Sequence, residues 1–245
     1  MNDAPRIALV TGCSRTAGIG FEVCRQLAEQ GISVFLTARD ASKANALAAT
    51  LSEQGFDVTG HALDISSVGS VQAIVALIEE RYGRLDILVN NATGAGRDRA
   101  PPSDSDLAGA RTVFDVTLFG NWRLTQACLP LLRESAAARI VNVSSSAGLH
   151  GDPVLGLTGK SPAGPAYSIA KTALNALTAK FAHELRDTGI KVNAVCPGFT
   201  ATWPGMEKLG ARPVAEGVEG IVWAAMLDED GPSGGFYRDQ QLQGW

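Results

Sequence analysis

Tyr167 and Lys171 stand four residues apart in the segment Tyr-Ser-Ile-Ala-Lys, and a serine run, 144–146, ends an apolar stretch upstream of them. Residues at i and i+4 lie on the same face of a helix. An ammonium beside a phenol can lower the phenol pKa from its ordinary value of about 10, which gives a usable proton donor. A nearby serine hydroxyl could hold the oxygen atom that receives the proton. Such a pair also occurs on many solvated helix faces, so the pair alone does not establish a site.

A glycine-rich segment near the N-terminus is the second feature with chemical meaning. The short apolar run 6–11 leads into Gly12-Cys-Ser-Arg-Thr-Ala-Gly18-Ile-Gly20, and an amphipathic run 21–30 follows and stops at Gly31. A strand, a glycine turn and a helix in this order open a dinucleotide-binding βαβ unit. Glycine lets the backbone approach a pyrophosphate, which the free N–H groups at the helix start then bind. The alternative, an ordinary glycine-bearing loop, is disfavoured by the flanking strand and helix.

Apolar runs typical of buried strands alternate with helical patterns along the whole chain. The expected strands are residues 6–11, 33–38, 57–63, 85–90, 139–144, 190–196 and 235–237. The helical patterns between them include 67–82, 110–133, 165–186 and 213–227. This alternation predicts the α/β class, with a doubly wound parallel sheet and helices on both faces, as in a Rossmann fold. No repeat or composition shift marks a second domain, so residues 1–245 are expected to form one domain.

Glycine and polar residues recur directly after the expected strands. Gly12 to Gly20 follow the first strand, Arg39 and Asp40 the second, Asp64 the third, Asn90 the fourth, Ser145 the fifth, and Pro197 and Gly198 the sixth. In sheets of this kind the ligand lies beyond the carboxyl ends of the strands. These residues are therefore predicted to meet at one edge of the sheet.

The composition indicates a globular protein with neither a nucleic-acid nor a membrane partner. The chain has 45% hydrophobic and 19% charged residues and a net charge of −4, and it has no apolar run long enough to span a bilayer. Residues 1–5 lack the features of a signal peptide. Four scattered cysteines and three histidines without ligand-like spacing predict no disulfide and no metal site. We expect a cytoplasmic protein.

With these residues assembled, the chain resembles a short-chain dehydrogenase/reductase of the compact, one-domain, carbonyl-reductase-like kind. The resemblance covers nearly the whole chain. It is carried by Thr11-Gly12…Gly18-Ile19-Gly20, Asp64, Asn90-Asn91-Ala92, Ser145, Tyr167-x-x-x-Lys171 and Pro197-Gly198-Phe199-Thr200. It implies an enzyme that interconverts a ketone or aldehyde and the corresponding alcohol by hydride transfer. Tyr167 would donate or accept the proton, Lys171 would lower the tyrosine pKa and hold the nicotinamide ribose, and Ser145 would hold the substrate oxygen.

The resemblance also implies a set of cofactor-binding residues. They are Gly12, Ser14, Arg15, Gly18, Ile19, Gly20, Arg39, Asp64, Ile65, Asn91, Ala92, Tyr167, Lys171, Pro197, Gly198 and Thr200. Arg39 stands where an NAD enzyme usually has an acidic residue, and with Arg15 it suits a 2′-phosphate. We therefore expect NADP(H) rather than NAD(H). The alternative is that Arg39 is solvated and Asp40 binds the ribose. Asp64 would contact the adenine or, equally, cap the helix that begins near Ser66.

Three features depart from the family's usual pattern. The glycine loop has two extra residues, Thr93 replaces a usual glycine, and Thr117 stands where the family has an asparagine. By the resemblance, that asparagine is a fourth catalytic residue, which anchors a water that relays protons to the lysine. Thr117 would keep this role if the backbone carbonyl holds the water, and would slow the relay if the amide is needed. These departures slightly favour an alternative function, a non-catalytic NADP(H)-binding redox sensor or regulator.

Two segments are expected to border the substrate. An insertion at about 149–165 must pass over the mouth of the active site, because both of its ends lie there. A second segment, about 199–212, carries Trp203, Met206 and Leu209. It is expected either to be a lid over an apolar substrate or to pack as a short helix on the core.

The remaining expectations concern the substrate's charge and the assembly. Arg97 and Arg99 could meet an anionic substrate group, but we favour a solvated loop. The resemblance implies a homodimer or homotetramer through the outer faces of helices 110–133 and 165–186. A long segment before the tyrosine accompanies monomeric carbonyl reductases, so a monomer is the alternative.

Overall fold

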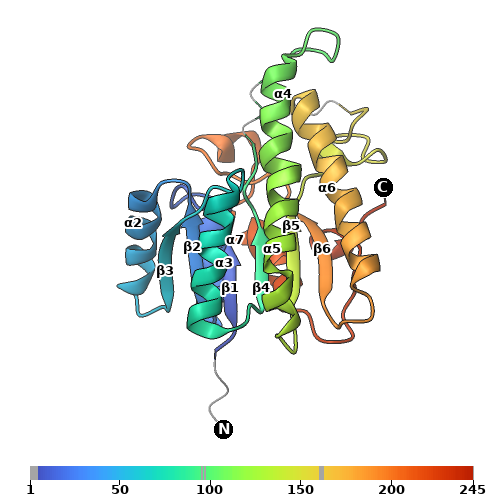
Figure 1. The fold of residues 1–245 in the computed structure, drawn as a ribbon. Coiled ribbons are helices and arrows are strands. Elements are labelled where there is room, and N and C mark those ends of the chain that lie inside the picture. The colour runs from blue at the N-terminus through green and yellow to red at the C-terminus, as the bar shows by residue number, and fades with distance from the viewer. Residues whose placement is uncertain (1–4, 95, 97, 160–162, 245) are drawn as a thin grey trace.

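The apolar runs form one eight-stranded sheet in the computed structural model of the chain, which describes residues 5–94, 96, 98–159 and 163–244 (Figure 1). The strands are β1 (Ile7–Val10), β2 (Ser33–Ala38), β3 (Val58–Ala62), β4 (Ile87–Asn90), β5 (Arg139–Val143), β6 (Lys191–Cys196), β7 (Phe236–Arg238) and β8 (Gln241–Leu242). Their order is β3-β2-β1-β4-β5-β6-β7-β8, and only β7 and β8 pair antiparallel. The order reverses between β1 and β4, which is where such sheets bind ligands.

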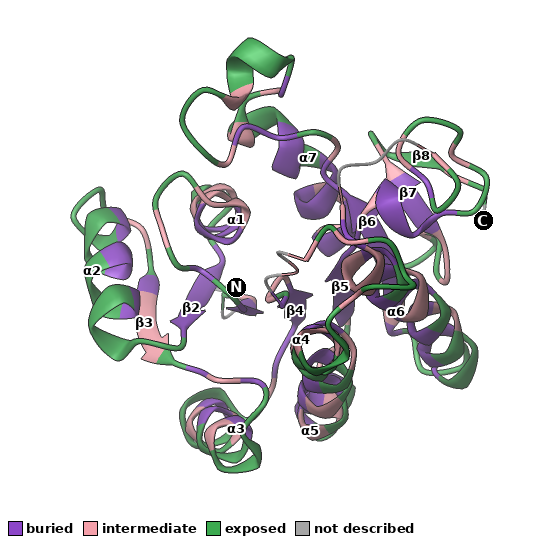
Figure 2. Cartoon of the chain, turned by 90° about the horizontal axis from the view of Figure 1, so that it is seen from above, coloured by how far each residue is buried: buried purple, intermediate pink, exposed green. Residues whose placement is uncertain are grey.

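Helices cover both faces of this sheet (Figure 2). The helices are α1 (Ile19–Glu29), α2 (Ala41–Ser52), α3 (Val68–Tyr82), α4 (Leu107–Phe114), α5 (Asn121–Arg133), α6 (Pro165–Glu184) and α7 (Val214–Ala225). A π-helical turn, η1 (Asp115–Gly120), joins α4 to α5, and short 3-10 turns lie at η2 (Ser146–Gly148) and η3 (Met206–Leu209). α1 and α7 lie on one face and α3, α5 and α6 on the other, while α4 extends the line of α5 past the strand ends.

The central strands are mostly apolar because each face of the sheet is covered. In β1, Ala8 and Val10 pack with residues of α1, α2 and α7, whereas Ile7 and Leu9 pack with α3, α5 and α6. All four side chains are buried, and each large one contributes about 1.5–3 kcal/mol relative to exposure. The core is thus two apolar layers that hold the strand ends, and the loops after them, in fixed relative positions.

The predicted class, a doubly wound parallel sheet in one domain, is confirmed, and the differences concern elements with weak sequence signals. α2 lies between β2 and β3, where the alternation of strands and helices predicted a helix without giving its bounds. β8 is a two-residue exposed strand after a turn with positive φ at Asp239 and Gln240. The helix expected over 110–133 starts at Leu107, since the Asp106 carboxylate accepts from the backbone N–H of Ala108 and Gly109. It is also interrupted by η1.

Candidate active site

The glycine loop after β1 fits a dinucleotide's phosphates by its backbone conformation. Gly12 has φ +76°, and a Cβ there would lie 2.8 Å from the Cα of Ala92. A Cβ on Gly20 would lie 2.6 Å from the Nδ2 of Asn91. α1 begins at Ile19 after Gly18, and no side chain caps it. The N–H groups of its first turn are therefore left for an anion, as a pyrophosphate requires.

The loop after β4 is bonded to the glycine loop across the switch point of the sheet. The hydroxyl of Thr11 accepts from the backbone N–H of Asn91 at 3.0 Å and of Ala92 at 2.9 Å. The Asn91 amide donates to the carbonyl of Thr11 at 2.7 Å. These bonds bring the predicted residues Gly12, Asn91 and Ala92 together in one cofactor-side wall.

The acidic residues beside the second and third strands serve local structure. Asp40 accepts from the backbone N–H of Ser42 at 2.9 Å and of Lys43 at 3.2 Å, so its carboxylate caps α2. Asp64 accepts from the N–H and the hydroxyl of Ser66, and these bonds, with Arg39 adding attraction, lower its pKa. The cap of α3 is Ser67, not Asp64. Asp40 is thus committed to a helix, while Arg39 is exposed beside it.

The other predicted nucleotide residues differ in what they contact. The guanidinium of Arg15 lies over the ring of Trp203, 3.8 Å from its centroid, and its buried Nε has no partner among the described residues. Burial lowers the pKa of Arg15. Ser14 is exposed, and Ile65 is buried, with its carbonyl accepting from Arg123. After β6, the carbonyls of Pro197 and Gly198 accept hydrogen bonds from the Thr200 hydroxyl.

Buried polar bonds between the sheet and α6 position the catalytic candidates. The Asn142 amide donates to Thr178 at 2.8 Å, and the Ser144 hydroxyl donates to Asn175 at 2.6 Å. The ammonium of Lys171, which is 2% exposed, donates to the carbonyl of Val143 at 2.7 Å. These bonds orient α6 against β5, because a buried polar group without a partner costs about 1–3 kcal/mol.

Ser145, Tyr167 and Lys171 lie together as predicted. The side chain of Ser145 lies near enough to the Tyr167 hydroxyl to lower the tyrosine pKa, and Ser145 accepts from the N–H of Ala147 at 3.2 Å. The Lys171 nitrogen is 5.6 Å from the centroid of the Tyr167 ring. Burial lowers the pKa of Lys171 to about 8.

The predicted lowering of the Tyr167 pKa by Lys171 is wrong. Burial raises the pKa of Tyr167 to about 12, Ser145 opposes the rise, and Cys196 adds to it. Lys171 does not contribute, because its ammonium is directed at the carbonyl of Val143. Desolvation, which the spacing of the pair does not reveal, decides the result.

Thr117 lies in the middle of η1, and its hydroxyl contacts Thr93, which also departs from the family pattern. It accepts from the N–H of Gly94 at 3.0 Å and lies 3.1 Å from the hydroxyl of Thr93. The Thr117 carbonyl accepts from the amide of Asn121 at 2.9 Å. Asn121 is 1% exposed, also donates to Ala92, and keeps an unpartnered Oδ1 among the described residues. Only its polar type on an apolar helix face could have indicated it from sequence.

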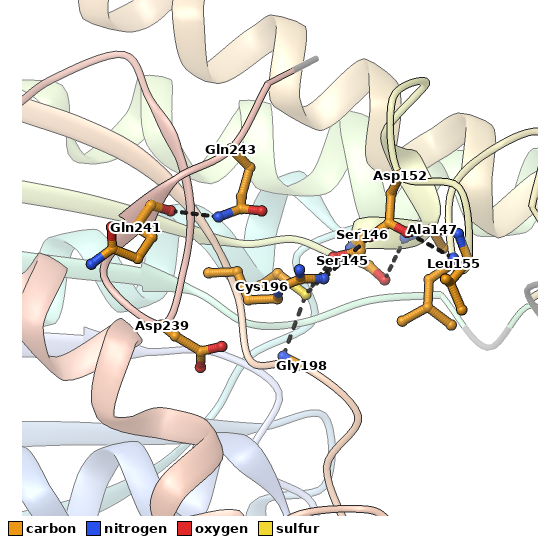
Figure 3. Close-up of polar contacts among 12 residues, drawn as sticks. Ser145, Ser146, Ala147, Asp152, Leu155, Cys196, Gly198, Asp239, Gln241 and Gln243 are labelled. Carbon is orange, nitrogen blue, oxygen red and sulfur yellow. Dashed lines mark hydrogen bonds and ion pairs between the residues drawn. The ribbon is translucent and has the colours of Figure 1, made fainter.

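A cavity of about 220 Å³ lies beside Ser145. Its described lining residues are Arg99, Ser145, Ser146, Ala147, Leu155, Ala163, Cys196, Gly198 and Phe199. The Cys196 sulfur accepts from the N–H of Ser146 at 3.3 Å and of Gly198 at 3.4 Å (Figure 3). Arg238 of β7 donates to Ser146 and to Asp152, which ties the insertion to the cavity floor. No sequence pattern indicates these roles of Cys196, Asp152 or Arg238.

The two expected substrate segments border this region in different ways. Of the insertion, the described residues Leu155 and Ala163 line the cavity, and residues 160–162 lie outside the described part of the chain, as does Arg97. In the segment 199–212, Phe199 lines the cavity, but Trp203 is 62% and Leu209 74% exposed. These two side chains therefore do not pack on the core, which excludes that alternative for them.

Two further features of the described residues bear on the site's chemistry. They include no group of three or more His, Cys, Asp or Glu side chains placed to hold a metal ion. Among the same residues, no helix has the length and apolarity that crossing a membrane requires.

The fold and the site together define a Rossmann-fold oxidoreductase with a serine, tyrosine and lysine centre. The family model of short chain dehydrogenases matches residues 6–210, and the chain belongs to this family. It is accordingly an oxidoreductase that uses a nicotinamide cofactor and acts on a small molecule.

Known proteins of the family are similar over most of the chain. A protein of Streptomyces virginiae assigned as ketoacyl reductase of the monensin polyketide synthase is 40% identical, over 80% of this chain and 71% of that protein. (-)-Isopiperitenone reductase of Mentha piperita is 32% identical, over 99% of both chains. A structure assigned as a short chain dehydrogenase of Shigella flexneri 2a, complexed with NADP, has a TM-score of 0.82 at 28% identity, over 96% of this chain and 97% of that one.

Proposed function

We propose that the chain is an NADP(H)-dependent ketoreductase or carbonyl reductase, which interconverts a ketone or aldehyde and the corresponding alcohol. One observation carries the proposal. The Tyr167 hydroxyl lies near Ser145, which lines a cavity of about 220 Å³, and the nitrogen of buried Lys171 is 5.6 Å from the centroid of the tyrosine ring. A protein that only senses NADP(H) needs no such proton donor next to a cavity.

The proton chemistry follows from the burial of these groups. The bound cofactor would supply the hydride, and the Ser145 hydroxyl would donate to the substrate oxygen as negative charge develops there. Tyr167, with a pKa of about 12, carries its proton throughout the neutral range and can donate it to that oxygen. Lys171, with a pKa of about 8, is mostly charged at neutral pH, and its ammonium would hold the nicotinamide ribose of the bound cofactor.

The choice of NADP(H) is supported by what surrounds the end of β2. Asp40 already caps α2 with its carboxylate, which disfavours it as the ribose partner of NAD(H). Arg39 is exposed at the same edge, and the Nε of Arg15 in the glycine loop has no partner among the described residues. Two guanidinium groups can bind a 2′-phosphate by charge-assisted hydrogen bonds. Fluorescence titration should give a lower dissociation constant for NADPH than for NADH.

Tyr167→Phe tests the catalytic assignment. The variant should fold and bind NADPH but lose about 10²- to 10⁴-fold in the rate of NADPH oxidation, because it cannot donate a proton. The assay uses a panel of aromatic, cyclic and dicarbonyl compounds. Tyr82→Phe, on the exposed side of α3, is the matched control and should keep full activity. Near-normal turnover in Tyr167→Phe would reject the role of the phenol.

The alternative, a redox sensor, predicts a different pattern in the same assay. A sensor would bind NADPH tightly in the wild type and in Tyr167→Phe, with no turnover on any carbonyl compound. Tyrosine-dependent turnover on one compound is enough to reject it.

We also propose that the protein forms a homodimer through the outer side of the α4–α5 helix. Phe119 and Trp122 are 48% and 39% exposed there, and two large apolar side chains so near in sequence suit a contact between subunits. Light scattering after gel filtration should give twice the chain mass, and Trp122→Glu should shift the measured mass to that of the monomer.

We propose a cytoplasmic location as well. The four cysteines are free thiols, which supports a reducing compartment such as the cytoplasm.

A further inference from the structure

A second cavity, of about 330 Å³, adjoins the one beside Ser145. The two cavities share Arg99 and Ala163 as lining residues. The second is bordered by the loop that follows Arg99, by described residues of the insertion, and by the first turn of α6, which contributes Pro165, Ser168 and Ile169. A ligand in the catalytic cavity could therefore extend past Arg99 into the second one.

The backbone around Arg99 is fixed against the start of the catalytic helix. A Cβ on Gly164 would lie 1.8 Å from the carbonyl oxygen of Asp98, and one on Gly96 would lie 3.0 Å from the Cβ of Tyr167. The Asp98 carboxylate accepts from the N–H of Ala100 at 2.9 Å and of Asp106 at 3.0 Å. Arg99 is thus held between the two cavities, and its acidic neighbour is occupied by backbone donors.

Among the described residues that line the second cavity, Arg99 has a charged side chain and Ser168 has a hydroxyl. Arg99 is exposed and has no hydrogen bond or ion pair with any described residue. Ser168 is 7% exposed, and its hydroxyl is likewise without a partner in the described part of the chain. The first turn of α6, a helix of 20 residues, adds the positive end of its dipole. No acidic side chain is among the described residues that line either cavity.

We propose that Arg99, the Ser168 hydroxyl and the first turn of α6 form an anion subsite for the substrate. It binds a carboxylate or phosphate on a ketone whose carbonyl lies at Ser145 and Tyr167. The inference rests on the proposed function and narrows it to keto acids or phosphorylated ketones. It also replaces the expectation that Arg99 belongs to a solvated loop, because Arg99 lines both the cavity beside Ser145 and the second cavity.

Matched substrate pairs test the subsite. The pairs are levulinate with methyl levulinate, and dihydroxyacetone phosphate with dihydroxyacetone. The wild type should have the higher kcat/KM for the charged member of at least one pair, and the pair that responds separates carboxylate from phosphate recognition. In Arg99→Ala that advantage should fall about 10- to 100-fold, mainly through KM, since a hydrogen bond to a charged group contributes about 1.5–3 kcal/mol. The neutral members should change less than about twofold.

Two controls separate charge recognition from a structural role. Arg99→Lys should restore part of the preference, because it keeps the charge but not the planar fork. Arg111→Ala removes an exposed arginine of α4 and should change nothing. Equal losses on charged and neutral ketones, or no loss at all, would overturn the subsite.

Binding keeps the subsite testable if turnover fails. Calorimetric titration of levulinate and of dihydroxyacetone phosphate into the NADPH complex of Tyr167→Phe needs no catalysis. Anion binding that is lost in Arg99→Ala would support the subsite, even if the wild type shows no turnover. Missing turnover would count against the proposed reaction and not against the subsite. Absence of binding of both anions in a protein that holds NADPH would reject the subsite and leave the reductase proposal standing.

Discussion

The cofactor side and the substrate side of the same strand ends are built in different ways. On the cofactor side, backbone atoms make the surface, and Gly12 and Gly20 approach Ala92 and Asn91 so closely that no Cβ fits. On the substrate side, side chains of loops make the surface, and Arg99 and Phe199 are exposed. The comparison indicates that the first side fixes the reaction, whereas the second can change its substrate without disturbing the fold.

Lys171 gives the largest expected effect, a change in the free energy of unfolding with pH that arises from its burial. Burial lowers its pKa from 10.5 to about 8, so the charged form destabilises the fold at neutral pH. Between about pH 8 and 10.5 the folded chain has lost this proton while the unfolded chain still binds it. Stability from Lys171 therefore rises across that window, by on the order of 3 kcal/mol.

Urea unfolding at pH 7.5 and pH 10.5 of the wild type and Lys171→Met measures this effect. The difference in unfolding free energy between the two proteins should shift toward the wild type as pH rises. Lys180→Met, an exposed lysine of the same helix, corrects for the loss of one lysine. A difference that does not change with pH would show that Lys171 is not desolvated in the folded chain.

Trp203 joins the two sides, since it belongs to the substrate-side segment but stacks on Arg15 of the glycine loop. If Arg15 binds the 2′-phosphate, Trp203 holds its guanidinium in place, and a cation–π contact is worth about 0.5–2 kcal/mol. Trp203→Leu should therefore raise the dissociation constant of NADPH about two- to tenfold and leave that of NADH unchanged. Trp203→Phe should lie between.

Leu209→Ala is the control for this prediction, because it changes another exposed apolar residue of the same segment. An equal weakening of NADPH and NADH in Trp203→Leu would mean that the segment acts as a general cover and does not position Arg15.

The strand, glycine loop and helix at the start of the chain were predictable from sequence because their signals are local. The glycine spacing between a strand and a helix predicts a close backbone approach in the loop. The Tyr-x-x-x-Lys segment predicts that both side chains lie on one face of a helix. The sheet class followed in the same way from alternating apolar and helical runs. Asp40 shows the limit of such local signals, since only the exact start of α2 shows that its carboxylate is a cap.

What could not be predicted depends on residues far apart in the chain. Asn121 reaches Ala92, and Arg238 reaches Ser146 and Asp152, across the fold. The raised pKa of Tyr167 arises from burial by several elements, which no spacing reveals. The π-helical turn at Thr117 likewise has no pattern in an otherwise regular helical run.

Thr117→Asn gives the smallest expected effect and decides between the two interpretations of that residue. The Thr117 hydroxyl bonds Gly94 and Thr93, whereas its carbonyl bonds the amide of Asn121. If the position acts through its carbonyl, kcat should stay within about twofold of the wild type.

Thr117→Val is the matched control, because it keeps the shape and removes the hydroxyl. It should lower the free energy of unfolding by about 1–3 kcal/mol, since the buried N–H of Gly94 loses its acceptor, with kcat little changed.

A tenfold gain of kcat in Thr117→Asn would instead show that a side-chain amide is missing from the proton path. Thr93 would then be an adaptation to the loss of that amide, because the exposed Thr93 hydroxyl contacts the hydroxyl of Thr117, which stands in place of the asparagine.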